Sequence, residues 1–303
     1  MQTIVTGGAG FIGSHLVDAL LERGHGVHVV DDHSTGRREN LAAGAELHEL
    51  DIRDERTASV VTEVRPEVIF HLAAQSDVGT SVARPVHDAD VNVVGTVRVL
   101  EAARAVGARV VFTSTGGAIY GECVRPARED DERRPASPYA ASKLSGEEYL
   151  ATWNRLHGTS HVVCRLANVY GARQQPKLEG GVVAIFLDRL RDGREVEIFG
   201  DGEQTRDFVF VGDVVEALLA AASAPAAGLF NVGTGIETSI LELLRLCGLA
   251  ADREQQPRLS PARPGDLLRS VLDPGRSRRE LGWQATTSLP DGLARTWDAM
   301  PVA

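Results

Sequence analysis

A glycine-rich run at residues 7–13 most constrains what this chain can fold into. It joins a short β-branched run at 3–6 to a helical pattern at 11–23, which carries apolar residues on one stripe. Glycines at this spacing permit a tight turn, a close approach of backbone N–H groups to a pyrophosphate, and close packing of helix and strand. The run therefore predicts a dinucleotide-binding turn, whose candidate cofactor residues are Gly7, Gly10, Phe11, Ile12 and Gly13.

Short β-branched runs alternate with longer amphipathic stretches through the first half of the chain. That alternation is typical of a parallel sheet with helices on both faces. We therefore predict an α/β fold with a doubly wound, Rossmann-type parallel sheet. Strands are expected at 3–6, 27–30, 45–50, 68–72, 109–114 and 161–166, and helices near 11–23, 56–64, 86–105 and 139–157.

The alternation loosens in the second half, where a helical stretch at 182–191 and a loop rich in proline and arginine at 256–266 are expected. We predict an NAD-binding domain over 1–170 and a smaller C-terminal α/β substrate domain over 171–303. Strand and helix character returns in between, so the chain is expected to re-enter the first domain at about 206–236.

Two acidic residues, Asp31 and Asp32, end the second predicted strand. A carboxylate there can accept hydrogen bonds from the adenosine ribose and would repel a 2′-phosphate. Arg37 and Arg38 lie close enough to favour NADP instead, but the carboxylates lead us to predict NAD. Weaker cofactor candidates follow the third and fourth strands: Asp51, Ile52, Leu72, Ala73 and Ala74.

Tyr139 and Lys143 lie one turn apart at the start of a predicted helix, after Ser137 and Pro138. A lysine ammonium nearby, together with a positive nicotinamide ring, would lower the tyrosine pKa from its reference value of about 10. The pair therefore predicts a general base that works near neutral pH. Thr115, at the end of a preceding predicted strand, is a third catalytic candidate.

The composition argues against several other classes of protein. Nine histidines without metal-binding spacing and three widely separated cysteines predict neither a metal site nor a disulfide. A formal net charge of −10 argues against nucleic-acid binding. The sequence has no apolar run of about 18 residues and no secretory signal, so we expect no membrane span and a cytoplasmic location.

The order of these motifs resembles that of the extended short-chain dehydrogenases/reductases, and more narrowly their nucleotide-sugar epimerase group, of the UDP-glucose (UDP-galactose) 4-epimerase type. The resemblance covers nearly the whole chain. It is carried by the glycine-rich turn, the Tyr-x-x-x-Lys pair and the segments 71–75, Asn92, 120–121, 165–171, 206–211, 231–233 and 263–266.

This resemblance implies an NAD-dependent 4-epimerase that acts on a UDP- or dTDP-hexose. Tyr139 would take the proton from the sugar 4-hydroxyl while hydride passes from C4 to the nicotinamide, and Lys143 would bind the nicotinamide ribose. A homodimer formed through the helices at 86–105 and 139–157 is expected. The resemblance adds Asn92 to the cofactor residues and assigns the sugar nucleotide to Asn168, Val182, Arg206, Arg263 and Asp266.

One departure concerns the hydroxyl group that these epimerases often place four residues before the tyrosine at 120. That position is Gly116, so either Thr115 supplies the hydroxyl through a shifted turn or Tyr139 acts with less help. The segment 115–118 also lacks the Thr-Asp-Glu triplet with which related dehydratases eliminate water.

Other functions stay open at this point. A nucleotide-sugar decarboxylase, dehydratase or reductase of the same fold, or a UDP-uronic acid 4-epimerase, would share most of these motifs. A dinucleotide-binding protein without catalysis would be expected to have a broken Tyr-x-x-x-Lys pair, and here the pair is intact.

Overall fold

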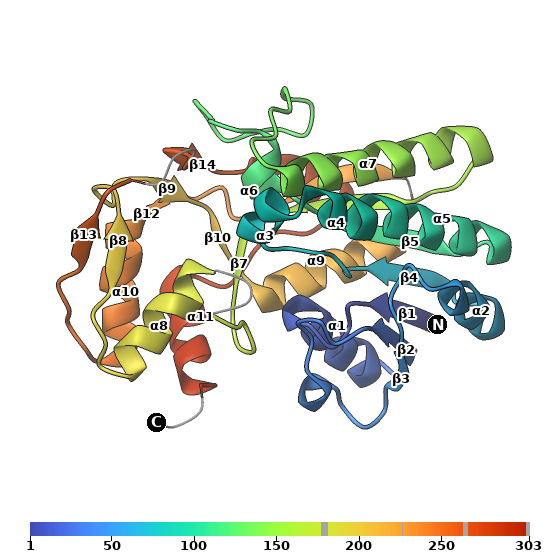
Figure 1. Cartoon of the computed structure of the whole chain (residues 1–303), viewed down its shortest axis with the longest axis horizontal. Helices are drawn as coiled ribbons and strands as arrows, with labels where there is room; N and C mark the ends of the chain where they lie inside the picture. The colour runs from blue at the N-terminus through green and yellow to red at the C-terminus, as the bar shows by residue number, and fades with distance from the viewer. Residues whose placement is uncertain (177–180, 226, 263–265, 301–303) are drawn as a thin grey trace.

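Seven parallel strands form the central sheet of the computed structural model, which describes residues 1–176, 181–225, 227–262 and 266–300 (Figure 1). The strands lie in the order β3-β2-β1-β4-β5-β6-β11. Their bounds are β1 Gln2–Thr6, β2 Gly26–Asp31, β3 Glu46–Glu49, β4 Val68–His71, β5 Arg109–Thr115, β6 Val162–Leu166 and β11 Gly228–Val232. The winding reverses between β1 and β4, which is the switch point of a Rossmann-type sheet. The predicted fold class is confirmed.

Helices cover both faces of this sheet (Figure 1). α1 (Phe11–Glu22) and α9 (Val211–Ser223) pack together on one face. α2 (Glu55–Val64), α5 (Gly95–Val106) and α7 (Pro138–His157) enclose the core on the other face. Because helices lie on both sides, a central strand such as β4 is buried along its whole length.

The helix predicted at 86–105 is present, but it contains a π-helical turn between two α-helical segments. α4 (Pro85–Ala89) leads into one π-helical turn, η2 (Asp90–Val94), before α5 begins. The backbone stays helical through both junctions. Within the wide turn, the Asn92 amide donates to the carbonyl of Gln75 at 2.9 Å, in the loop after β4. π-turns of this kind occur most often at functional sites.

A smaller lobe lies beside the sheet, on the left of Figure 1, and has its own hydrophobic core. Its helices are α8 Val182–Arg191, α10 Ile240–Ala251 and α11 Leu289–Asp298. Its short strands form the pairs β8 Glu197–Phe199 with β13 Arg258–Ser260 and β7 Asn168–Tyr170 with β10 Phe208–Phe210, and the sheet of β9 Thr205–Arg206, β12 Thr238–Ser239 and β14 Arg269–Ser270. The loop predicted at 256–266 thus contains the strand β13, which is too short to show a period of two.

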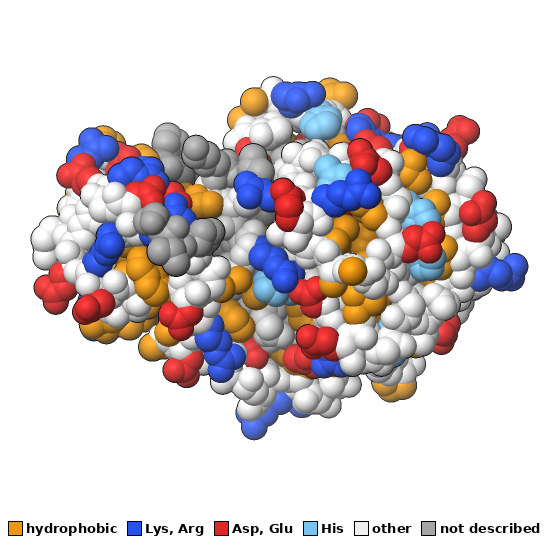
Figure 2. All heavy atoms as spheres, turned by 90° about the horizontal axis from the view of Figure 1, so that it is seen from below, with side chains coloured by type: hydrophobic (Ala, Val, Ile, Leu, Met, Phe, Trp, Pro, Cys, Tyr) orange, Lys and Arg blue, Asp and Glu red, His pale blue; other side chains and the backbone are white. Residues whose placement is uncertain are grey.

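The chain returns to the large sheet after β10. α9 packs on α1, and β11 pairs with β6, with Phe230 opposite Cys164. The remaining elements are short: η1 Arg38–Asn40, α3 Val78–Ala83, α6 Gly116–Ile119 and η3 Ser277–Leu281. Within the described ranges, none of the helices has the length and apolar character needed to cross a membrane. Figure 2 shows acidic and basic side chains intermingled over one face of the molecule.

Candidate active site

A cavity of about 1080 Å³ opens where β1, β2 and β4 end, and residues of the smaller lobe complete its wall. Ligands of doubly wound sheets bind at this edge. Most predicted site residues line the cavity: Gly7, Gly10, Phe11, Ile12, Gly13, Asp31, Asp51, Ile52, Leu72, Ala73, Ala74, Tyr139, Asn168, Val182, Arg206 and Asp266. Thr115, Lys143 and Asn92 do not line this wall. Arg263 lies outside the described residues.

The glycine-rich turn brings backbone to the floor of the cavity. Gly7 has a φ of 70°, and a Cβ there would lie 2.7 Å from the backbone nitrogen of Ala73, so only glycine fits. A Cβ on Gly13 would lie 2.1 Å from the carbonyl oxygen of Gly7, which explains how α1 packs so close to the turn. No side chain caps the start of α1 at Gly10. The N-terminus of this helix can therefore hold an anion such as a pyrophosphate.

Asp31 presents a buried carboxylate at the end of β2. One oxygen accepts a hydrogen bond from the N–H of Ala9 and the other from the N–H of His33, each at 2.9 Å. Burial raises the pKa of this carboxyl, and the two backbone donors oppose the rise. Each oxygen keeps lone-pair capacity, so the carboxylate can still accept bonds from ribose hydroxyls.

Asp51 lines the same wall but is already paired. Its carboxylate accepts from the Arg53 guanidinium, at 2.9 Å from Nε and 2.5 Å from Nη2, and these bonds lower the pKa of Asp51. Arg53 also bonds to Asp90 in η2. This part of the wall is therefore a fixed ion-pair array, and a direct contact between Asp51 and the cofactor stays a prediction.

Tyr139 and Lys143 are placed by the start of α7. The hydroxyl of Ser137 caps the helix by accepting from the N–H of Ala140 at 3.2 Å. Tyr139 reaches the cavity, whereas Lys143 is 3% exposed and holds its Nζ 4.2 Å from the centre of the Phe112 ring. An aromatic face attracts a cation at this distance. The phenol therefore faces the ligand space while the ammonium lies behind it.

The surroundings shift the pKa values of both groups. Burial, together with the Asp88 carboxylate, raises the pKa of Tyr139 to about 12, and Thr115 opposes the rise. Burial also lowers the pKa of Lys143 to about 7, against the pull of Glu147 and Asp88. The dry protein environment disfavours the charged forms of both groups, and the lowering of the tyrosine pKa by a charged lysine together with a nicotinamide ring stays a prediction.

Thr115 lies at the end of β5, and its hydroxyl lowers the pKa of the nearby Tyr139. At Gly116, the next residue, a Cβ would lie 2.5 Å from Cδ1 of the buried Leu272, so a side chain there would force Leu272 to shift. A catalytic role for Thr115 stays a prediction.

Sequence reasoning missed Asp88, a buried carboxylate behind the cavity wall. It accepts from the amides of Gln75 at 2.9 Å and Asn92 at 3.1 Å. Asn92 in turn donates to the hydroxyl of Ser142 on α7 at 3.1 Å. Asn92 therefore supports the wall from behind in this structure, and no sequence pattern distinguished Asp88 from a surface residue of the same helix.

On the side of the smaller lobe, Arg206 and Asp266 form an ion pair at the cavity, with 2.5 Å between Nη2 and Oδ1. Arg206 also donates to the carbonyl of Leu267 at 2.8 Å. Asn168 and Val182 line the same region. Arg189 lines it as well and was not predicted. Arginine in such a position suits a diphosphate because its planar fork can bind two oxygens at once.

The fold and this site define a class of protein. The sequence model of the NAD dependent epimerase/dehydratase family matches residues 3–233, and the chain belongs to this family. The match spans the glycine-rich turn, Tyr139 and Lys143, and the strand β11.

Within this family, the chain is similar to several UDP-glucose 4-epimerases. It is 51% identical to the UDP-glucose 4-epimerase of Mycolicibacterium smegmatis, over 98% of this chain and 97% of that protein. Its structure is similar to that of the UDP-glucose 4-epimerase of Thermotoga maritima with UDP-glucose, with 45% identity, a TM-score of 0.96 and coverage of 99% and 98% of the two chains. It also resembles the Thermus thermophilus UDP-glucose 4-epimerase in complex with NAD, with 43% identity, a TM-score of 0.93 and the same coverage.

Proposed function

We propose that this protein is an NAD-dependent UDP-glucose 4-epimerase. The observation that carries the proposal is the position of Tyr139, which lines a cavity that extends from the glycine-rich turn to Arg206, and whose pKa is lowered by the neighbouring Thr115. The short helix after β5 begins Gly116-Gly117-Ala118 and brings no carboxylic acid to this point. Full-length similarity to UDP-glucose 4-epimerases supports the same conclusion.

In this reaction Tyr139 takes the proton from the sugar 4-hydroxyl and returns it after the sugar has turned over. Thr115 lowers the pKa of the phenol and so favours its ionised form. Lys143, when charged, would favour the same ionisation, and it would hold the nicotinamide ribose. The buried setting keeps water away from the proton being moved.

The cavity fits NAD at its sheet end. The uncapped N-terminus of α1 and the glycines that leave no room for a Cβ suit the pyrophosphate, and Asp31 suits the adenosine ribose. NAD bound there would supply reversible hydride transfer at C4 of the sugar. The remaining predicted cofactor residues are proposed to line its path: Phe11, Ile12, Asp51, Ile52, Leu72, Ala73 and Ala74.

The sugar nucleotide is proposed to occupy the end of the cavity next to the smaller lobe. Arg206 would bind the diphosphate, and Asp266 the nucleoside ribose once it is released from its ion pair with Arg206. Asn168 and Val182 would hold the sugar from β7 and the start of α8. Arg263 stays a sequence prediction for the diphosphate.

A homodimer is proposed through the helices that follow β4 and through α7. Val82 on α3 is 63% exposed and Val86 on α4 is 82% exposed, an unusual position for valine. The exposed apolar side chains of this surface are Val78, Val82, Val86, Val94, Tyr149 and Leu156. Light scattering that finds a monomer at micromolar concentration would contradict the proposal.

The NAD-binding domain is proposed to span residues 1–170, and the chain is proposed to re-enter it at about 206–236. The substrate domain is proposed to span 171–303. Support comes from β11, which pairs with β6 in the large sheet although α8 and β8 lie between them in sequence. The cytoplasm stays the location predicted from the sequence.

The activity is tested by incubating the purified protein with UDP-glucose, UDP-galactose, UDP-N-acetylglucosamine, UDP-glucuronic acid and dTDP-glucose, followed by chromatography and mass determination. We expect UDP-glucose and UDP-galactose to interconvert with unchanged mass and no net NADH. Loss of water, loss of carbon dioxide or stoichiometric use of NADH would instead indicate a dehydratase, a decarboxylase or a reductase.

The role of Tyr139 is tested by Tyr139→Phe. Removing a general acid–base typically costs about 10²–10⁴ in rate, so turnover should fall by that range while bound NAD, measured after denaturation, is retained. The matched control is Tyr149→Phe, ten residues further along α7 and 39% exposed. Loss of bound NAD in Tyr139→Phe alone would indicate a structural role for the phenol.

A further inference from the structure

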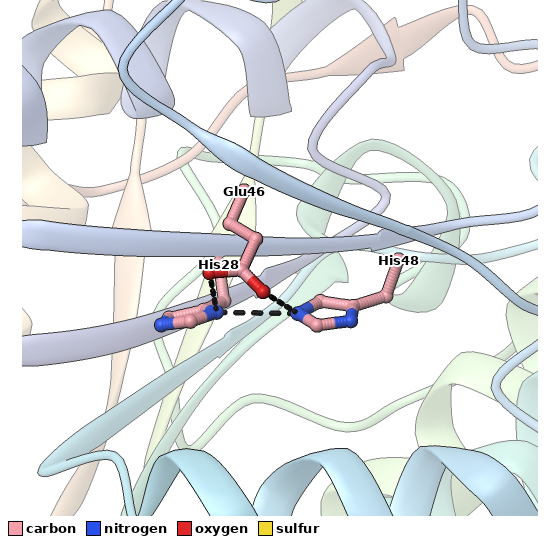
Figure 3. Close-up of side chains that lie close together, drawn as sticks. All are labelled: His28, Glu46 and His48. Atoms are coloured by element: carbon pink, nitrogen blue, oxygen red, sulfur yellow. Dashed lines mark hydrogen bonds and ion pairs between the residues drawn. The ribbon is translucent and has the colours of Figure 1, made fainter.

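Three side chains from β2 and β3 converge at an edge of the large sheet (Figure 3). In the strand register His28 lies opposite Glu46, and Val30 lies opposite His48. Because alternate residues of a strand share a face, His28, Glu46 and His48 project to the same side. None of the three lines the cavity. The sequence predicted no metal site, but spacing along the chain does not reveal a cluster that strand pairing assembles.

The separations between the donor atoms match those around a tetrahedral ion. Nδ1 of His28 lies 3.2 Å from Nε2 of His48. Oε2 of Glu46 lies 3.5 Å from the first nitrogen, and Oε1 of the same carboxylate lies 3.8 Å from the second. Zinc binds nitrogen and oxygen at about 2.0–2.1 Å, which places the donors of a tetrahedron about 3.3–3.4 Å apart. The three groups therefore need little movement to close on one ion.

The surroundings favour a neutral imidazole at His28 and leave a path for solvent. The side chains of His28 and His48 are 19% and 21% exposed, whereas that of Glu46 is 66% exposed. Burial lowers the pKa of His28, and the neighbouring His48 lowers it further against the pull of Glu46. A neutral imidazole offers a lone pair, and that is the form in which histidine binds metals.

We propose that His28, Glu46 and His48 form a binding site for a divalent transition-metal ion of the zinc type, with water in the remaining position. Two imidazoles and one carboxylate are a donor set that zinc accepts. The ion would replace the hydrogen bond that joins the two imidazoles, and it would balance the charge of Glu46. It would also join the edge strand β3 to β2 at His28, which lies three residues before Asp31. This proposal is independent of the epimerase reaction.

The test is calorimetric titration of the full chain, freed of any purification tag and of bound metal by EDTA, with zinc chloride. We expect one ion per chain in the high-affinity phase and no comparable binding of magnesium, which prefers oxygen ligands. Loss of an outer-shell partner alone weakens metal binding about 10–100-fold, so His28→Gln and His48→Gln should each weaken zinc binding at least tenfold. The control is His157→Gln, on the exposed end of α7.

Circular dichroism and epimerase turnover, measured before zinc is added, establish that each variant is folded. Glu46→Gln provides a further variant, since the side chain of Glu46 is largely exposed and its loss leaves the core unchanged. The proposal is overturned if the wild-type protein shows no saturable zinc binding, or if all three cluster variants bind zinc as tightly as His157→Gln.

Discussion

Leu272 occupies the space beside Gly116, where a Cβ would lie 2.5 Å from its Cδ1 and 2.8 Å from its Cδ2. Leu272 is itself buried in the core beneath the sheet. A side chain at 116 would therefore force Leu272 to shift, and the hydroxyl that lowers the pKa of Tyr139 is that of the preceding residue, Thr115. The identity of one core residue is thus tied to the position of a proposed catalytic group.

Thr115→Val should lower turnover while bound NAD and the melting temperature stay close to wild type. The change removes a hydrogen bond to a group that becomes charged, worth about 1.5–3 kcal/mol, which corresponds to roughly tenfold to 150-fold in rate. Thr115→Ser keeps the hydroxyl and should retain most of the activity. Equal turnover in the valine and serine variants would contradict the role of the hydroxyl.

Gly116→Ser should destabilise the protein because the new side chain collides with Leu272. Overpacking of this kind costs about 1–3 kcal/mol in the free energy of unfolding. The double variant Gly116→Ser with Leu272→Ala should lose less stability than the sum of the two single changes, since the alanine makes room for the serine. Strict additivity in urea denaturation would mean that the two positions do not compete for space.

Asp88→Asn should move the acidic limb of the pH–rate profile to lower pH. The Asp88 carboxylate raises the pKa of Tyr139, so an uncharged amide lets the phenol ionise more readily. The control is Asp90→Asn, two residues further on, whose carboxylate is half exposed and pairs with Arg53. A profile that moves equally in both variants would point to a general electrostatic effect instead of a specific one.

The sequence revealed the features that depend on local pattern. The glycine-rich turn, the strands around it and the helix that begins at Ser137 follow from backbone conformation and capping, which act over a few residues. The spacing of Tyr139 and Lys143 likewise predicted both on one side of α7; Tyr139 lines the cavity, and Lys143 lies against the Phe112 ring.

What the sequence could not reveal depends on burial and on strand pairing. The sign of the Tyr139 pKa shift follows from how dry its surroundings are and from Asp88, which approaches from another helix. Thr115 could not be preferred over an unaided Tyr139 without the contact between Gly116 and Leu272. The π-helical turn at Asn92 could not be predicted from the spacing of apolar residues, because the backbone has ordinary helical angles at both of its ends.

Glu147→Gln should destabilise the protein strongly. Glu147 and Arg165 form a buried ion pair, with 2.6 Å between Oε2 and Nη2 and side chains 2% and 0% exposed. Removing one partner leaves an uncompensated buried charge, which costs about 3–5 kcal/mol. The control is Glu216→Gln, whose exposed pair with Arg23 should contribute less than about 1 kcal/mol. Similar losses in both variants, measured by urea denaturation, would contradict the difference expected from burial.

Two buried histidines should make the protein less stable in mild acid. Burial lowers the pKa of His71 to about 3 and that of His161 to about 4, from the ordinary value of 6.5. Below pH 6.5 these two histidines therefore bind protons in the unfolded chain but stay neutral in the folded protein. The free energy of unfolding falls as the pH falls from 6.5 towards 4 and then 3. Each histidine contributes a slope of up to about 1.4 kcal/mol per pH unit in this window.

His161→Asn isolates the contribution of one of these groups. Nδ1 of His161 accepts the N–H of Val110 at 3.0 Å, and the asparagine oxygen can take over that bond without titrating. Urea denaturation at a series of pH values from 7 to about 4 should give a shallower slope for this variant than for the wild-type protein. His157→Asn, which changes an exposed ring on α7, should leave the slope as it is. If the slope of His161→Asn equals that of the wild type, protonation of His161 does not drive the acid sensitivity.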